Sequence, residues 1–117
     1  MSFFDFLFRS KRTQRRFAEF LKPNFLLVDV RTPQEFSSGS IPNSVNVPLE
    51  NLYEQLARLK NSKSIVLFCR SGNRSRYAKD LLIRNGIKSV WDGGGMEQLK
   101  KMISEVETTN KNSSWKK

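Results

Sequence analysis

The stretch from Ser64 to Leu82 constrains the fold more than any other part of the chain. It begins with a run of apolar residues, 65–68, and then passes through Cys69 into a polar loop. After the loop, one helical face is formed by Tyr77, Ala78, Leu81 and Leu82. A short apolar run followed by helical periodicity indicates a buried strand that leads into a helix. We therefore expect the loop at the carboxyl end of a parallel strand, where open α/β sheets bind their ligands.

Cys69 is the only cysteine and stands directly before this loop, which consists of Arg70, Ser71, Gly72, Asn73, Arg74 and Ser75. If the loop curls over the sulfur, its backbone N–H groups form an anion-binding nest, and the following helix points its positive dipole end at the same place. Arg70 and Arg74 add two positive charges. Together these groups favour the nucleophilic thiolate form. Gly72 is the position where a positive φ costs least, and Ser71 or Asn73 is expected to cap the helix.

The position of Cys69 decides between two interpretations. A lone cysteine is most often a buried, inert apolar residue. Such a residue would lie within the apolar run, whereas Cys69 stands where the run meets arginines, a glycine and an asparagine, which favours catalysis. The chain has no histidine, so a Cys–His dyad and a histidine-ligated metal are excluded. A single cysteine also excludes an internal disulfide and a cysteine-rich metal site, and we predict no metal and no cofactor.

The rest of the chain alternates between strand and helix patterns. Strands are expected at 25–30, 44–47 and 89–91, and helices at 32–38, 49–59 and 96–106. Thr32 and Glu35 have the spacing of a capping box, with Pro33 at the first helical position. The segment Asp92–Gly95 is predicted to be a flexible turn beside the site. The alternation predicts an α/β fold with a mainly parallel sheet and helices on both faces.

Three segments, Asp29–Pro48, Cys69–Ser75 and Asp92–Met96, together resemble the single-domain rhodaneses, a family of sulfurtransferases. The resemblance implies a rhodanese-like, mainly parallel five-strand sheet, with a first strand from the N-terminal region. It also implies transfer of sulfane sulfur from thiosulfate or a persulfide donor to a thiol, a protein or cyanide, through a persulfide on Cys69. Residues 70–75 would bind the small anionic donor. Asp29 and Arg31 would support the active-site end of the sheet.

Two alternatives remain open at this stage. Cell-cycle phosphatases and arsenate reductases of the same superfold use a longer ring, in which an arginine stands six residues after the cysteine. Here Ser75 occupies that place and Arg74 comes one residue early, so the ring suits a sulfur atom better than a phosphate. A non-catalytic rhodanese-like binding module is the other alternative. Such modules usually lose the cysteine, which this chain keeps.

The 117 residues and 38% hydrophobic content are enough for one domain with a modest core. We expect a basic, Phe-rich arm or helix at 1–22, with a short helix from residue 11 that turns Phe17, Phe20 and Leu21 inward. The rhodanese-like domain is expected at 23–106, followed by a disordered tail at 107–117. The apolar part of the first ten residues is too short to span a bilayer and is a poor signal peptide, so a cytoplasmic location is expected.

The net charge of +10 is concentrated in two places, residues 1–22 and 69–79. The second cluster surrounds the cysteine and is expected to attract small anions. The charge also permits nonspecific binding to nucleic acid, but no specific nucleic-acid site is predicted. Residues 1–16 combine aromatic and basic residues, which favours a weak contact with an acidic membrane surface or a partner chain, or packing against their own domain.

Overall fold

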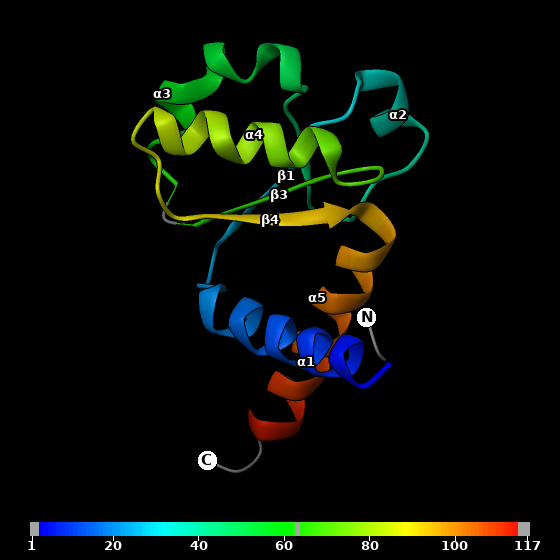
Figure 1. The fold of residues 1–117 in the computed structure, drawn as a ribbon. Helices are drawn as coiled ribbons and strands as arrows, with labels where there is room; N and C mark the ends of the chain where they lie inside the picture. The colour runs from blue at the N-terminus through cyan, green and yellow to red at the C-terminus, as the bar shows by residue number, and fades with distance from the viewer. Residues whose placement is uncertain (1–2, 63, 115–117) are drawn as a thin grey trace.

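The computed structural model describes residues 3–62 and 64–114, which form a four-stranded α/β unit (Figure 1). The elements in chain order are α1 (Phe3–Phe20), β1 (Leu26–Asp29), α2 (Pro33–Ser37), β2 (Val45–Asn46), the 3₁₀ turns η1 (Leu49–Asn51) and η2 (Tyr53–Gln55), α3 (Leu56–Leu59), β3 (Ile65–Cys69), α4 (Asn73–Arg84), β4 (Val90–Gly95) and α5 (Met96–Ser114).

The sheet has the strand order β2-β1-β3-β4, and every pair in it is parallel. β3 lies between β1 and β4 and is buried along its whole length. The parallel sheet was predicted, but the expected five strands were wrong, because the described residues form four. The segment before β1 is the long helix α1, whose charged and aromatic residues lack the alternation of a strand.

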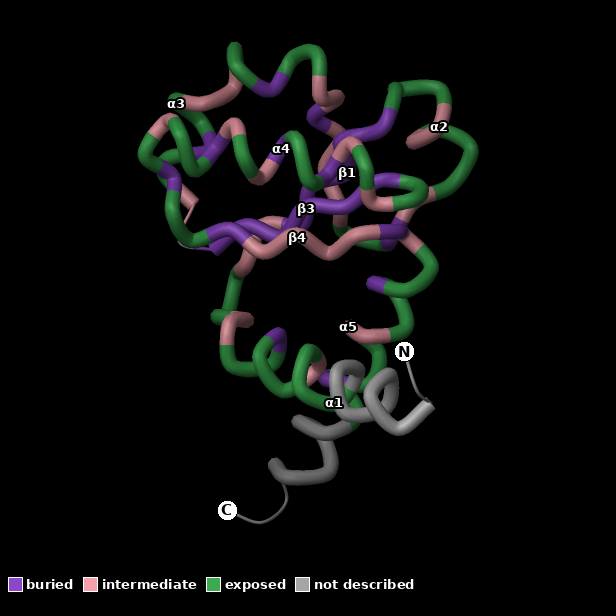
Figure 2. Tube along the Cα trace, in the orientation of Figure 1, coloured by how far each residue is buried: buried purple, intermediate pink, exposed green. Residues whose placement is uncertain are grey.

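Helices cover both faces of the sheet (Figure 1): α3 and α4 lie on one face, and α1 and α5 on the other. The side chains of β3 alternate between the two resulting cores. Leu67 and Cys69 belong to the core on the α4 face, together with Ala78 and Leu82. Phe68 belongs to the core on the α1 and α5 face. In Figure 2 the buried trace accordingly follows the strands through the centre of the molecule. This alternation turns the Cys69 side chain toward α4.

Two local predictions were only partly right. The leucines of residues 49–59 were expected on one helix, but the segment forms η1, η2 and the short α3. Leu52 and Leu59 are fully buried all the same, because steps of three residues suit 3₁₀ turns as well as an α-helix. Tyr77 was expected on the buried face of α4 but is 66% exposed. The buried stripe of α4 is narrower than the sequence pattern indicated.

Both terminal segments are more helical than expected. α1 is one helix from Phe3 to Phe20, and not an arm followed by a short helix. Phe17 is fully buried, with its ring centroid 5.3 Å from that of Trp91, and Phe20 packs on the same ring at 5.6 Å. α5 continues past 106 to Ser114, where we expected disorder, because 96–114 contains no glycine or proline to end it. The rest of the expected tail, 115–117, lies outside the described residues.

None of the helices in the described ranges combines the length and the apolar character needed to cross a membrane.

Candidate active site

The cysteine loop places backbone amides around a single sulfur atom. Cys69 is the last residue of β3, and the chain turns back at Gly72, whose φ of 104° is in the region that favours glycine. The amide of Gly72 donates to Cys69 Sγ at 3.0 Å, and the amide of Ser75 donates to the same atom at 3.4 Å. Cys69 itself has no exposed surface. The sulfur is therefore covered, but by groups that point hydrogen-bond donors at it.

The start of α4 contributes to the same arrangement. Gly72 is the N-cap residue, and no side chain caps the helix, so the expected capping by Ser71 or Asn73 was wrong. An N-cap side chain would satisfy an amide of the first turn. Here the amide of Ser75, in that first turn, is directed at the sulfur instead. The positive end of the α4 dipole thus adds to the individual hydrogen bonds.

These contacts lower the pKa of the Cys69 thiol below its ordinary value. Burial is the largest single influence and raises the pKa, because it disfavours the charged form. Hydrogen bonding from Ser75, whose amide donates to the sulfur, and from the amides of Gly72 and Ser71 lowers the pKa and outweighs burial. The thiolate is thus favoured by fixed dipoles, and the chain has no imidazole to assist them.

Asp92 is a site residue that sequence reasoning missed. Ser75 Oγ donates to Asp92 Oδ1 at 2.6 Å and lies 3.1 Å from the carbonyl oxygen of Gly72. The same carboxylate oxygen accepts the amide of Gly94 at 3.0 Å. We predicted a flexible turn at 92–95, but these residues belong to β4, and Gly95 is the register partner of Cys69. The sequence signal that could have identified Asp92 is a carboxylate directly after the expected strand 89–91.

The glycines of β4 allow the cysteine loop to approach this strand closely. A Cβ atom at Gly95 would lie 2.9 Å from the carbonyl oxygen of Arg70, which is too close for a real side chain. A Cβ atom at Gly72 would meet the backbone of Gly94 at 3.6 Å. The predicted close approach of the glycine segment to the loop is therefore present, although it occurs on a strand and not in a turn.

Asp29 and Arg31 form a buried ion pair at the carboxyl end of β1. Arg31 Nη2 lies 2.7 Å from Asp29 Oδ2, and Arg31 Nε contacts both carboxylate oxygens at 3.0 Å. The pair also holds the neighbouring loop, because Arg31 Nη2 donates to the carbonyl oxygen of Gly39 and Ser40 Oγ donates to Asp29 Oδ2. The hydrogen bonds to Asp29 raise the pKa of Arg31. Asp29 and Arg31 thus fix the loop that forms one wall of the site.

Arg74 is placed differently from the sequence expectation. Its two terminal nitrogens contact Glu35 Oε1 at 2.6 Å and Oε2 at 3.0 Å. Glu35 also accepts from the amide of Thr32 and completes the predicted capping box of α2. The hydrogen bonds from Arg74 are the main reason that the pKa of Glu35 is lowered to about 2. Arg74 therefore ties the cysteine loop to α2 and has its guanidinium occupied.

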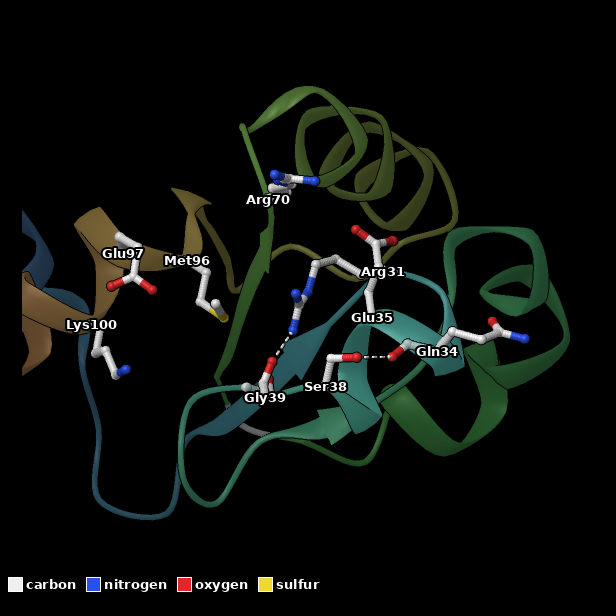
Figure 3. Close-up of a pocket in the computed structure, with 10 residues that line it drawn as sticks. Arg31, Gln34, Glu35, Ser38, Gly39, Arg70, Met96, Glu97 and Lys100 are labelled. Atoms are coloured by element: carbon white, nitrogen blue, oxygen red, sulfur yellow. Dashed lines mark hydrogen bonds between the residues drawn. The ribbon is translucent and has the colours of Figure 1, made fainter.

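A pocket of about 690 Å³ opens next to the cysteine loop, at the carboxyl edge of the sheet (Figure 3). Met96, Glu97 and Lys100 line it from α5, and Gln34 and Glu35 line it from α2, with Ser38 directly after that helix (Figure 3). Arg31, Arg70 and the loop residues Gly39 and Ser40 complete the lining. Of the two loop arginines predicted to bind the substrate, Arg70 lines this pocket and Arg74 does not.

A family model for the rhodanese-like domain matches residues 13–102 of this chain. The chain belongs to the rhodanese-like domain family. Asp29, Arg31, Glu35, Cys69 and Asp92 all lie within the matched residues.

Several relatives carry sulfurtransferase names, and others are named tRNA uridine(34) hydroxylases. The chain is 37% identical over 86 residues to the putative sulfurtransferase YtwF of Bacillus subtilis, covering 74% of this chain and 79% of that protein. It is 36% identical over 65 residues to a sulfurtransferase of Allochromatium vinosum, covering 56% of this chain and 61% of the relative. Among solved structures, a rhodanese with anions from E. coli superposes with a TM-score of 0.58 at 27% identity, covering 63% of this chain and 89% of the other.

Proposed function

We propose that this protein transfers sulfane sulfur from thiosulfate or a persulfide donor through a persulfide on Cys69. The Cys69 thiolate attacks the outer sulfur of thiosulfate, the bond between the two donor sulfurs breaks, and sulfite leaves with the bonding electron pair. A thiol or cyanide then removes the outer sulfur and restores the thiolate. The observation that carries the proposal is the convergence of the Gly72 and Ser75 amides on Cys69 Sγ.

The residues around the sulfur have distinct roles in this proposal. The amides of the loop stabilise the thiolate, and they hold the anionic outer sulfur of the persulfide. Arg70 is exposed and lines the pocket, so it attracts the donor and stabilises the departing sulfite. Because Cys69 has no exposed surface, the donor reaches the sulfur only after neighbouring groups of the loop shift. Arg74 keeps the loop in position through Glu35.

Phosphate chemistry is less well supported by this site. A phosphatase needs a guanidinium that turns into the loop and binds the phosphate oxygens. The guanidinium of Arg74 is bound to Glu35 instead, and Ser75 takes the sixth position after the cysteine. A purely binding role is also disfavoured, since a module that only binds has no use for a thiol with a lowered pKa.

The proposal is tested by intact mass spectrometry after treatment with thiosulfate. We expect a gain of one sulfur, about 32 Da, that is confined to Cys69 and removed by cyanide with formation of thiocyanate. The variant Cys69→Ser is the control and should gain no mass and produce no thiocyanate. A wild-type protein that gains no sulfur, or a Cys69→Ser variant with equal activity, would contradict the proposal. Hydrolysis of an aryl phosphate without sulfur transfer would favour the phosphatase alternative.

A further inference from the structure

The pocket beside the cysteine loop extends along the first turns of α5. Arg70, which lines it, follows Cys69 in the chain. Met96, which also lines it, follows Gly95, the register partner of Cys69. Cys69 is buried and does not line the pocket, so a molecule held there reaches the sulfur past Arg70 once the loop shifts. Lys100 stands four residues after Met96, on the same face of α5 and about 6 Å further along its axis.

The charges of the pocket fall into two groups. Arg31 is neutralised by Asp29, and the carboxylate of Glu35 is neutralised by Arg74. Within residues 3–62 and 64–114, Arg70, Glu97 and Lys100 form no ion pair, and all three are exposed. The charges left for a ligand are thus two cations and one carboxylate. The pocket keeps an excess of positive charge on the path to the sulfur.

We propose that Lys100 and Arg70 form a carboxylate subsite that selects an anionic organic thiol as the sulfur acceptor. This inference rests on the proposed sulfur transfer, and it concerns the second half of that reaction. The acceptor thiolate attacks the outer sulfur of the Cys69 persulfide, a new sulfur–sulfur bond forms, and the bond to Sγ breaks. The electron pair of that bond returns to Cys69 Sγ as the thiolate, so no oxidant or reductant is required.

Lys100 is the residue of this subsite that distinguishes the acceptor from the donor. Arg70 follows Cys69 in the chain and is exposed, so it attracts any anion, including the donor. Lys100 lies a full helical turn beyond Met96, so its ammonium meets a carboxylate that is separated from the thiol by several bonds. Thiosulfate has no such extension. A change at Lys100 should therefore alter the acceptor step and leave the donor step unchanged.

The chain provides a matched control in the next residue. Lys101 is also an exposed lysine of α5, but it is not among the residues that line the pocket. Replacing either lysine by alanine changes the net charge of the protein by the same amount. Any difference between the two variants therefore reports the position of the charge, and not the general attraction of a basic protein for anions.

The experiment measures discharge of the isolated persulfide. Wild type, Lys100→Ala, Lys100→Glu and Lys101→Ala are loaded with thiosulfate, desalted, and mixed with 3-mercaptopropionate, 6-mercaptohexanoate, 2-mercaptoethanol or cysteamine. The ratio of variant rate to wild-type rate is taken for each thiol, which cancels the intrinsic reactivity of that thiol. We expect Lys100→Ala to slow at least one of the two anionic thiols by roughly three- to fivefold, as fits an exposed ion pair. Lys100→Glu should slow them further and accelerate cysteamine.

The two proposals fail in different ways. If Lys100→Ala changes the rate for all four thiols by the same factor, or if Lys101→Ala behaves like Lys100→Ala, the carboxylate subsite is refuted while the persulfide mechanism stands. If thiosulfate adds no sulfur to Cys69, the sulfur-transfer function is refuted and the subsite with it. High salt gives a further check, because it should reduce the difference between Lys100→Ala and wild type.

Discussion

Replacing Ser75 by alanine removes the hydroxyl that joins the cysteine loop to β4, and leaves the backbone amide of residue 75 in place. Two effects are expected. The pKa of Cys69 rises, because the Ser75 hydroxyl, which donates to Asp92, holds in place the residue whose amide donates to Cys69 Sγ and lowers that pKa. The fold is also less stable, because Asp92 Oδ1 loses its 2.6 Å hydrogen bond and retains only the amide of Gly94. A hydrogen bond to a charged, half-buried carboxylate is worth about 1.5 kcal/mol, which lowers the midpoint of thermal unfolding by roughly 6 °C.

The assay is the pH dependence of Cys69 alkylation by iodoacetamide, which reacts with the thiolate. The midpoint of the Ser75→Ala curve should lie at higher pH than that of the wild type, and sulfur transfer at pH 6 should fall more than at pH 9. Ser71→Ala is the matched control, because the Ser71 side chain is exposed and its contribution to the sulfur comes from its amide. Coincident alkylation curves for Ser75→Ala and wild type would refute the role of this hydroxyl, as would an equal shift in Ser71→Ala.

Two further changes test other parts of the structure. Glu35→Gln should cost about 1 kcal/mol near neutral pH, since the pair with Arg74 is partly exposed at 35% and 27%. The pKa of Glu35 is lowered from 4.5 to about 2, so the stabilisation of the fold by ionised Glu35 is present above pH 4.5 and is lost as the pH falls toward 2. In urea unfolding, the free energy of unfolding of Glu35→Gln should therefore fall less than that of the wild type across this pH range. Phe17→Ala should lower the free energy of unfolding by about 3–4 kcal/mol in the same assay, because it empties a fully buried site against Trp91. Phe17→Leu should lower it less. A negligible loss of stability in Phe17→Ala would mean that α1 is not part of the folded core.

The part of the site that the sequence predicted is the part built from neighbouring residues. The strand that ends at Cys69, the turn at Gly72 and the capping box of Thr32 and Glu35 each depend on a few consecutive residues. Their patterns are local, so they can be recognised without knowledge of the fold. The pairing of Asp29 with Arg31 could be anticipated for the same reason, because the two residues are two positions apart.

The features that sequence reasoning missed depend on contacts between distant segments. Arg74 meets Glu35 across 39 positions, and Ser75 meets Asp92 across 17 positions. The strand β4 continues to Gly95 because it pairs with β3 as far as Cys69. This pairing joins distant segments, so it could not be read from the residues after Val90 alone. The leucines of residues 49–59 were equally ambiguous, since their spacing is compatible with both 3₁₀ and α-helical turns.

Among the described residues, Arg31 and Arg74 are paired with carboxylates and Arg70 is not. Arg31 and Arg74 are each neutralised by a carboxylate, so their charges contribute rigidity and little net potential at the sulfur. The sulfur is stabilised instead by the amide dipoles of Gly72 and Ser75. In the proposed reaction, Arg70 attracts the donor from solvent. Because its charge is exposed, it is screened by salt, so ionic strength should weaken the capture of thiosulfate while the thiolate itself is little affected.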